Sequence, residues 1–84
     1  MVTAKKLEKF KTEFGEHVRK KRLAKGWSQE KLADLMGNNA QNISRLERGR
    51  INPSLFWCLH LAKAFDIKFC EFVADFEVKG KKER

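Results

Sequence analysis

The sequence predicts a small all-α domain, and two observations carry this prediction. The stretch Ser28–Gly49 reads SQEKLADLMGNNAQNISRLERG, with apolar residues at helical spacing on both sides of Gly37. Residues 3–25 repeat an apolar side chain every three or four positions among lysines and glutamates, which is typical of an amphipathic helix. The length of 84 residues allows one domain with an adequate core and leaves no room for a second, catalytic domain.

Ser28–Gly49 is predicted to be a helix-turn-helix. Ser28 can cap the first helix, because its hydroxyl accepts from a backbone N–H that the helix leaves unpaired. Gly37 suits the turn, since glycine adopts a left-handed conformation at a helix end without a Cβ clash. Asn39 can cap the second helix, and the small Ala33 lets the two helices cross closely.

The second helix of this motif has an apolar face and a polar face. Ile43 and Leu46 fall on one side, toward the predicted core. The other side carries amides and guanidinium groups, whose donors and acceptors match base edges in a major groove. We expect base reading by Ala40, Gln41, Asn42 and Arg45. A polar face that only meets solvent is the alternative, and the preceding turn and basic composition disfavour it.

A later helix is expected to follow the helix-turn-helix. Pro53 and Ser54 are expected to begin a helix whose core stripe consists of Leu55, Cys58, Leu61, Ala62 and Phe65. Asp66 would end it in the left-handed conformation, which aspartate tolerates at modest cost. In the first helix, Gly15 weakens helical structure locally and is the expected place for a bend.

The chain resembles the lambda-repressor/Cro (XRE) family of helix-turn-helix domains over residues 14–74. The matching residues are Arg19, Arg22, SQEKLA (28–33), Gly37, Ile43, LERG (46–49), NPS (52–54) and LAKAFDI (61–67). The resemblance implies five helices, the third of them in the major groove, with an extended first helix in this chain. Known members are mostly transcriptional repressors, phage switch proteins, restriction–modification controllers and antitoxins.

The charge balance points to a polyanionic partner. Nineteen Lys and Arg against eleven Asp and Glu give a net charge of +8 and a pI near 9.8. Neutralising phosphates releases condensed counterions, which favours binding of nucleic acid. Charge alone does not separate DNA from RNA or an anionic membrane, but the helix-turn-helix favours double-stranded DNA. The residues expected at phosphates are Arg22, Ser28, Gln29, Asn38, Asn39, Ser44, Arg48, Arg50 and Asn52.

Arg22 and Glu47 stand at positions that form an ion pair in the family, between the first helix and the end of the third. The resemblance therefore predicts this pair here, with the arginine near a DNA phosphate. A planar guanidinium meets a carboxylate through two hydrogen bonds and tolerates partial burial. The alternative is two unrelated surface charges, which would contribute little. We expect the pair to fix the angle of the reading helix.

Three segments are expected: a basic amphipathic extension of the first helix at 1–13, the helix-turn-helix domain at 14–76, and a disordered charged tail at 77–84. The later part of the chain holds more aromatic surface than a small core can hide. One interpretation is extra core beneath Leu7 and Phe10. The other is a homodimer interface, which the family forms with its fifth helix. We assign Phe69, Phe72, Val73 and Phe76 to that interface.

No enzyme, cofactor or metal site is predicted. His17 and His60 are isolated on separate helices, and no nucleophile stands beside a base. Cys58 and Cys70 lack metal-ligand spacing and form no disulfide framework, which fits a reducing cytoplasm. No apolar run is long enough to span a bilayer, so a cytoplasmic location without membrane contact is expected.

Two functions remain open from the sequence. The first is a sequence-specific transcriptional regulator, expected to be a repressor, that binds a palindromic operator as a homodimer through the major groove. The second is an antitoxin or similar interaction module of the same fold, which would mask a partner protein such as a toxin. The two are compatible, because antitoxins of this fold often also repress their own operon.

Overall fold

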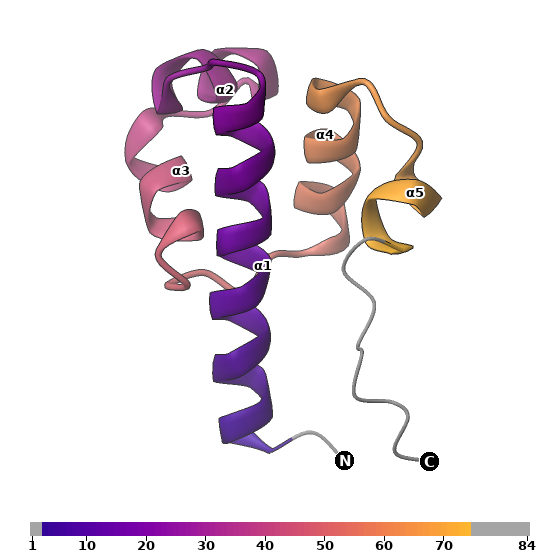
Figure 1. Cartoon of the computed structure of the whole chain (residues 1–84). Helices are drawn as coiled ribbons and strands as arrows, with labels where there is room; N and C mark the ends of the chain where they lie inside the picture. The colour runs from indigo at the N-terminus through magenta and orange to yellow at the C-terminus, as the bar shows by residue number, and fades with distance from the viewer. Residues whose placement is uncertain (1–2, 75–84) are drawn as a thin grey trace.

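The computed structural model describes residues 3–74, and all regular structure in this part of the chain is helical. The helices are α1 Ala4–Ala24, α2 Gln29–Met36, α3 Ala40–Glu47, α4 Leu55–Phe65 and α5 Phe69–Ala74. In Figure 1, α1 runs the length of the molecule, with α3 on one side and α4 and then α5 on the other. α2 lies at the C-terminal end of α1. The prediction of an all-α, five-helix fold is confirmed for these residues.

All five helices contribute to one core. Its buried apolar residues are Phe14, Val18, Leu32, Ala33, Ile43, Leu46, Leu61, Ala62, Phe65 and Phe72. Aromatic rings join the helices, since Phe14 meets Phe72 edge-on at 5.8 Å and Trp27 stacks on Phe65 at 5.7 Å between ring centroids. α3 therefore packs on the hydrophobic core through Ile43 and Leu46, which are almost fully buried.

The predicted helix ends are confirmed. Ser28 Oγ and Asn39 Oδ1 each accept from the backbone N–H three residues later, at 3.0 and 2.9 Å. Gly37 ends α2 with a φ of 67°, the left-handed conformation that a glycine adopts without strain. Asp66 ends α4 in the same conformation, with a φ of 60°. The turn between α2 and α3 is thus specified by residues local to it.

The assignment of Phe72 to a homodimer interface is wrong. Its side chain is fully buried inside the monomer, between the rings of Phe14 and Phe65. Phe69 is half-buried and packs against the core, whereas Val73 is 38% exposed. Phe76, the fourth residue assigned to this interface, lies outside the described residues, as does the tail 77–84.

Two expectations about single residues also change. The sequence predicts Leu55 in the core stripe of its helix, but Leu55 is 65% exposed because the inward face of α4 begins further along. α1 continues unbroken through Gly15. A Cβ there would clash with the Leu46 carbonyl oxygen and would stand 2.7 Å from that of Glu47. Gly15 is therefore the point where α1 and the end of α3 touch backbone to backbone.

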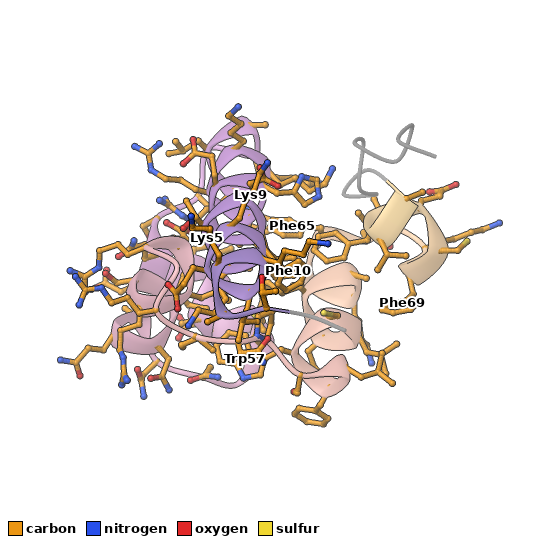
Figure 2. The ribbon with its side chains drawn as sticks, turned by 90° about the horizontal axis from the view of Figure 1, so that it is seen from below. Lys5, Lys9, Phe10, Trp57, Phe65 and Phe69 are labelled. Atoms are coloured by element: carbon orange, nitrogen blue, oxygen red, sulfur yellow. The ribbon has the colours of Figure 1, made fainter. Side chains whose placement is uncertain are left out.

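The described part of the N-terminal extension continues α1 without interruption. Phe10 stacks on Phe14 at 5.7 Å and packs against the core, which supports the interpretation of extra core in this region. Seen along α1 in Figure 2, Phe10 lies on the side toward α4 and Lys5 on the opposite side. On another side of α1, Thr12 lies close enough to Gly49 that a Cβ on the glycine would stand 3.1 Å from it.

Candidate nucleic-acid interface

The outward face of α3 carries the residues predicted to read bases. Gln41 and Arg45 are exposed, whereas Ala40, Asn42 and Ser44 are half-buried. Within residues 3–74, no hydrogen bond or ion pair engages the side chains of Gln41 and Arg45. Their amide and guanidinium groups are therefore available to a ligand, and they lie one helical turn apart on the same side of α3.

Asn42 is placed differently from these two residues. Its side-chain Nδ2 donates to Asn38 Oδ1 at 2.9 Å, and the same oxygen accepts from the backbone N–H of Asn39 at 2.8 Å. Because Asn38 Oδ1 already accepts from a backbone N–H, the amide orientation of both side chains is fixed by their partners. Asn42 thus links α3 to the turn. The groups of its amide that remain for hydrogen bonds to a ligand are its oxygen and one N–H.

Arg22 and Glu47 are paired in the structure. Arg22 Nε donates to Glu47 Oε2 at 2.7 Å, and Nη2 donates to Oε1 at 3.0 Å. The two side chains are only 9% and 2% exposed, so the pair is a buried link between α1 and the last residue of α3. Arg22 Nη1 also donates to the Trp27 carbonyl at 2.8 Å, which ties in the segment before α2.

The pKa of Arg22 is raised above its ordinary value, chiefly by the hydrogen bond to Glu47. Burial lowers it and the nearby carboxylate charge raises it further, so the guanidinium stays charged. Three of its five N–H groups are used within the protein. Arg22 is therefore placed as a structural residue, and its predicted phosphate contact stays a prediction.

Gln29 joins the same network, which sequence reasoning did not predict. Its Nε2 donates to Glu47 Oε1 at 3.1 Å, across 18 residues of sequence. Gln29 is the first residue of α2, so the Glu47 carboxylate holds together the C-terminal turn of α1, the start of α2 and the end of α3. No local pattern signals this contact, because it depends on the crossing angle of the two helices.

The other residues predicted at phosphates flank the outward face of α3. Ser28 and Asn39 are exposed caps at the starts of α2 and α3, and half-buried Asn38 lies in the turn between them. Beyond α3, Arg48, Arg50 and Asn52 are all exposed. Arg48 Nε lies 3.4 Å from the Ser44 carbonyl, which directs this side chain back along α3. Polar and cationic groups thus border the reading face at both ends.

The rest of the described chain offers little other chemistry. Residues 3–74 contain no cluster of three His, Cys, Asp or Glu side chains placed to hold a metal ion. Across the same residues, no helix has the length and apolarity needed to cross a bilayer. Cys58 is half-buried and Cys70 is exposed, and both are free thiols. Burial raises the pKa of the Cys58 thiol.

This arrangement, a capped helix pair whose second helix presents free polar side chains, defines the class of protein. Residues 18–72 match the sequence profile of the helix-turn-helix family HTH_3. The match covers more than half of the chain, so the chain belongs to this family of helix-turn-helix proteins, and the predicted XRE-type resemblance is confirmed. The protein is a transcriptional regulator with a helix-turn-helix DNA-binding domain.

Several proteins that are similar in sequence or structure also belong to this class. The chain is similar to the restriction-modification controller protein C.AhdI from Aeromonas hydrophila, with a TM-score of 0.68 and 44% identity over 73% of this chain and 92% of that one. It is 39% identical to the HTH-type transcriptional regulator YgzD of Bacillus subtilis strain 168, over 61% of this chain and 77% of the relative. It is 41% identical to the competence pilus inhibition repressor of Acinetobacter baylyi, over 64% of this chain and about half, 49%, of the relative.

Proposed function

We propose that this protein is a transcriptional repressor that binds a palindromic operator as a homodimer, with α3 in the major groove. The observation that carries the proposal is the contrast on α3. Gln41 and Arg45 are exposed with unengaged side chains, while Ile43 beneath them is fully buried. The similarity to a named repressor supports the direction of regulation.

Base reading is assigned chiefly to Gln41 and Arg45. A glutamine amide pairs with the N6 and N7 atoms of adenine, and an arginine guanidinium pairs with O6 and N7 of guanine. Ala40, at the start of α3, provides an apolar contact of the kind that recognises a thymine methyl group. Asn42 would add a single contact through the part of its amide that is not bound to Asn38.

Phosphate contacts are assigned to the polar groups around this face. The Ser28 hydroxyl oxygen accepts from the backbone at the start of α2, which leaves its own hydrogen available for a phosphate. The side of the reading face near the start of α2 is also bordered by Gln29 and Asn39. The side near the end of α3 is bordered by Ser44, Arg48, Arg50 and Asn52. Because these contacts displace counterions, we expect the association constant to fall steeply as salt concentration rises.

The homodimer would bury exposed apolar side chains. Val73 and the half-buried Phe69 form one small group on α5, and Leu55, Phe56 and Leu59 form a second on α4. Leu55 and Phe56 are 65% and 66% exposed, which is unusual for large apolar residues that lie next to each other. A Leu59→Lys and a Val73→Lys variant, compared by sedimentation equilibrium, would identify which group carries the dimer.

The exposed α4 group also suits the second candidate, a module that masks a partner protein. Isolation of the tagged protein from its native host separates the two functions. A stoichiometric protein partner whose binding is lost in Leu59→Lys, with operator binding retained, would favour the masking function.

Selection from a random pool of double-stranded DNA tests the main proposal. We expect an enriched site with two inverted half-sites, spaced by about one helical turn of DNA. Enrichment of a single half-site would contradict the homodimer. A pool that shows no enrichment would contradict sequence-specific binding by α3.

A further inference from the structure

The N-terminal turns of α1, residues 4–12, precede the segment that matches the helix-turn-helix family, residues 18–72. They form a capped and anchored helix. Thr3 Oγ1 accepts from the backbone N–H of Lys6 at 3.1 Å, which caps the start. Phe10 stacks on Phe14 at 5.7 Å, which holds these turns on the core. The backbone of this segment, and with it the direction of each side chain, is therefore fixed relative to α3.

The chain that follows α3 crosses α1 at Thr12. A Cβ on Gly49 would stand 3.1 Å from both the Cα and the Oγ1 atom of Thr12, so the two backbones touch here. Gly49 lies between Arg48 and Arg50, which are exposed and are both expected at phosphates. The Arg50 backbone N–H donates to the Arg45 carbonyl at 2.9 Å, which fixes this segment against the end of α3. The crossing therefore joins α1 to the border of the reading face.

Lys5 and Lys9 extend this group of cations along α1. They precede Thr12 by seven and three residues, and positions at these spacings share one face of a helix. Both are exposed, and Figure 2 shows Lys5 on the side of α1 away from α4. At about 1.5 Å of rise per residue, they lie roughly 10 and 5 Å beyond the crossing along the axis of α1. The cations after α3 and those on α1 thus form one row.

The glutamates of α1 do not neutralise this row. Residues 4–12 hold four lysines and one glutamate, Glu8, which pairs with Lys11 at 3.2 Å. Lys9 lies 3.8 Å from Glu13, in an exposed pair of the kind that contributes little to stability. Within residues 3–74, no ion pair engages Lys5. A phosphate can therefore bind these two ammonium groups without breaking a buried contact.

We propose that Lys5 and Lys9 bind DNA phosphates next to those contacted by Arg48 and Arg50, so that α1 lengthens the binding site beyond the bases that α3 reads. This inference rests on the proposed DNA-binding function. Duplex DNA fits the row because its phosphates also repeat along a line. The two lysines are one helical turn apart, with about 5–6 Å between their Cβ atoms, so each can meet a separate phosphate. An ammonium group is a compact charge with three donors and needs no fixed phosphate orientation.

Salt dependence gives these contacts a measurable signature. Each phosphate that a protein neutralises adds about 0.9 to the slope of the logarithm of the association constant against the logarithm of salt concentration. Loss of two contacts should therefore make the slope shallower by about 2. The DNA backbone carries no base identity, so the ratio of affinities for the selected site and for a site with one altered base pair should not change.

The test compares two double variants of the full chain on the selected duplex. Lys5→Gln/Lys9→Gln removes two charges and keeps good helix formers in α1. It should lose about tenfold in affinity near 0.1 M salt, with the shallower slope. Lys63→Gln/Lys68→Gln is the matched control, because it removes the same charge from exposed positions on α4 and before α5, across α1 from α3. We expect it to change the slope by less than about 0.5, since distant surface charges are screened.

Ethylation interference on the same duplex locates the contacts. In the wild-type map, we expect blocked phosphates that disappear in Lys5→Gln/Lys9→Gln and that adjoin those lost in Arg50→Gln. A slope change no larger than that of the control would overturn the proposal, and so would a map that Lys5→Gln/Lys9→Gln leaves unchanged. If the wild type selects no site from the random pool, the proposed function itself fails, and this inference fails with it.

Discussion

The two faces of α3 differ in whether their side chains already have partners within the protein. On the inward side, Ile43 is fully buried and the Glu47 carboxylate receives three hydrogen bonds. On the outward side, Gln41 and Arg45 are exposed and their side chains have no partner within residues 3–74. Buried contacts therefore fix the orientation of α3. The side chains on its outward face keep their hydrogen-bonding groups free for a ligand. Inward substitutions should change stability, whereas outward substitutions should change specificity.

Removal of the Glu47 carboxylate should have the largest effect. Glu47→Ala leaves the Arg22 guanidinium buried without its counter-charge, so we expect the free energy of unfolding to fall by about 3–5 kcal/mol. Urea denaturation followed by circular dichroism measures this loss.

Glu13→Ala is the matched control, because Glu13 is a surface residue. Its side chain is 57% exposed, and its carboxylate lies 3.8 Å from the Lys9 ammonium. An exposed pair of this kind contributes about 0–1 kcal/mol. If the two variants were destabilised equally, Glu47 would not be the inward anchor of α3. Should Glu47→Ala fail to fold, Glu47→Gln retains the size and one acceptor oxygen, and it should show a smaller loss.

A methyl group at Gly15 should force α1 and α3 apart. Gly15→Ala adds a Cβ within 3 Å of the backbone oxygens of Leu46 and Glu47, which cannot turn aside as a side chain could. We expect a net loss of about 1–3 kcal/mol in thermal or urea unfolding, despite the better helix propensity of alanine. Glu16→Ala, at the next and exposed position, should be nearly neutral. A gain of about 1 kcal/mol in Gly15→Ala, as at an open helical position, would contradict the close contact.

On the outward face, truncation should leave the fold intact. Gln41→Ala should change the free energy of unfolding by no more than about 0.5 kcal/mol, because no contact within the described residues is lost. Its affinity for the selected operator should nevertheless fall. Denaturation and binding measured on the same preparation check both parts. A stability loss comparable to that of Gly15→Ala would show that Gln41 supports the fold.

The two cysteines also differ in burial, and this difference should have the smallest effect. The effect is a difference in the reactivity of their thiols. Cys58 is half-buried and burial raises the pKa of its thiol, so the thiolate forms less readily in the folded protein than in the unfolded chain. Its contribution to stability is complete at pH below the unfolded-state pKa and declines as pH rises through the higher folded-state pKa. Near neutral pH, an alkylating reagent should label exposed Cys70 first, as peptide mass spectrometry would show. Equal rates would contradict the burial of Cys58.

The sequence was sufficient for the features that depend on neighbouring residues. Helical spacing and caps such as Ser28 and Asn39 predicted α2, α3 and their turn, because each feature is decided within a few positions. Ile43 and Leu46 were placed correctly in the core for the same reason. The Arg22–Glu47 pair came from the family resemblance, since nothing local joins residues 25 positions apart.

The remaining features depend on how the helices cross. The sequence predicts a phosphate contact for Gln29, whereas its bond to Glu47 appears only when α2 and α3 are placed together. The helix propensity of glycine predicts a bend at Gly15, whereas the structure shows that this glycine permits a close backbone approach between α1 and α3. The resemblance predicts an interface role for Phe72, but the packing of all five helices decides which aromatic residue closes the core. Side-chain periodicity identifies a face but not what covers it.

The most direct test of the account concerns Arg45. The wild type and Arg45→Ala should be titrated against the selected operator and against every single-base variant of one half-site. We predict that Arg45→Ala loses about 1–3 kcal/mol of binding free energy on the operator, ceases to discriminate at one base pair, and unfolds like the wild type. An equal loss on every duplex would make Arg45 a phosphate contact and would contradict base reading by the outward face of α3.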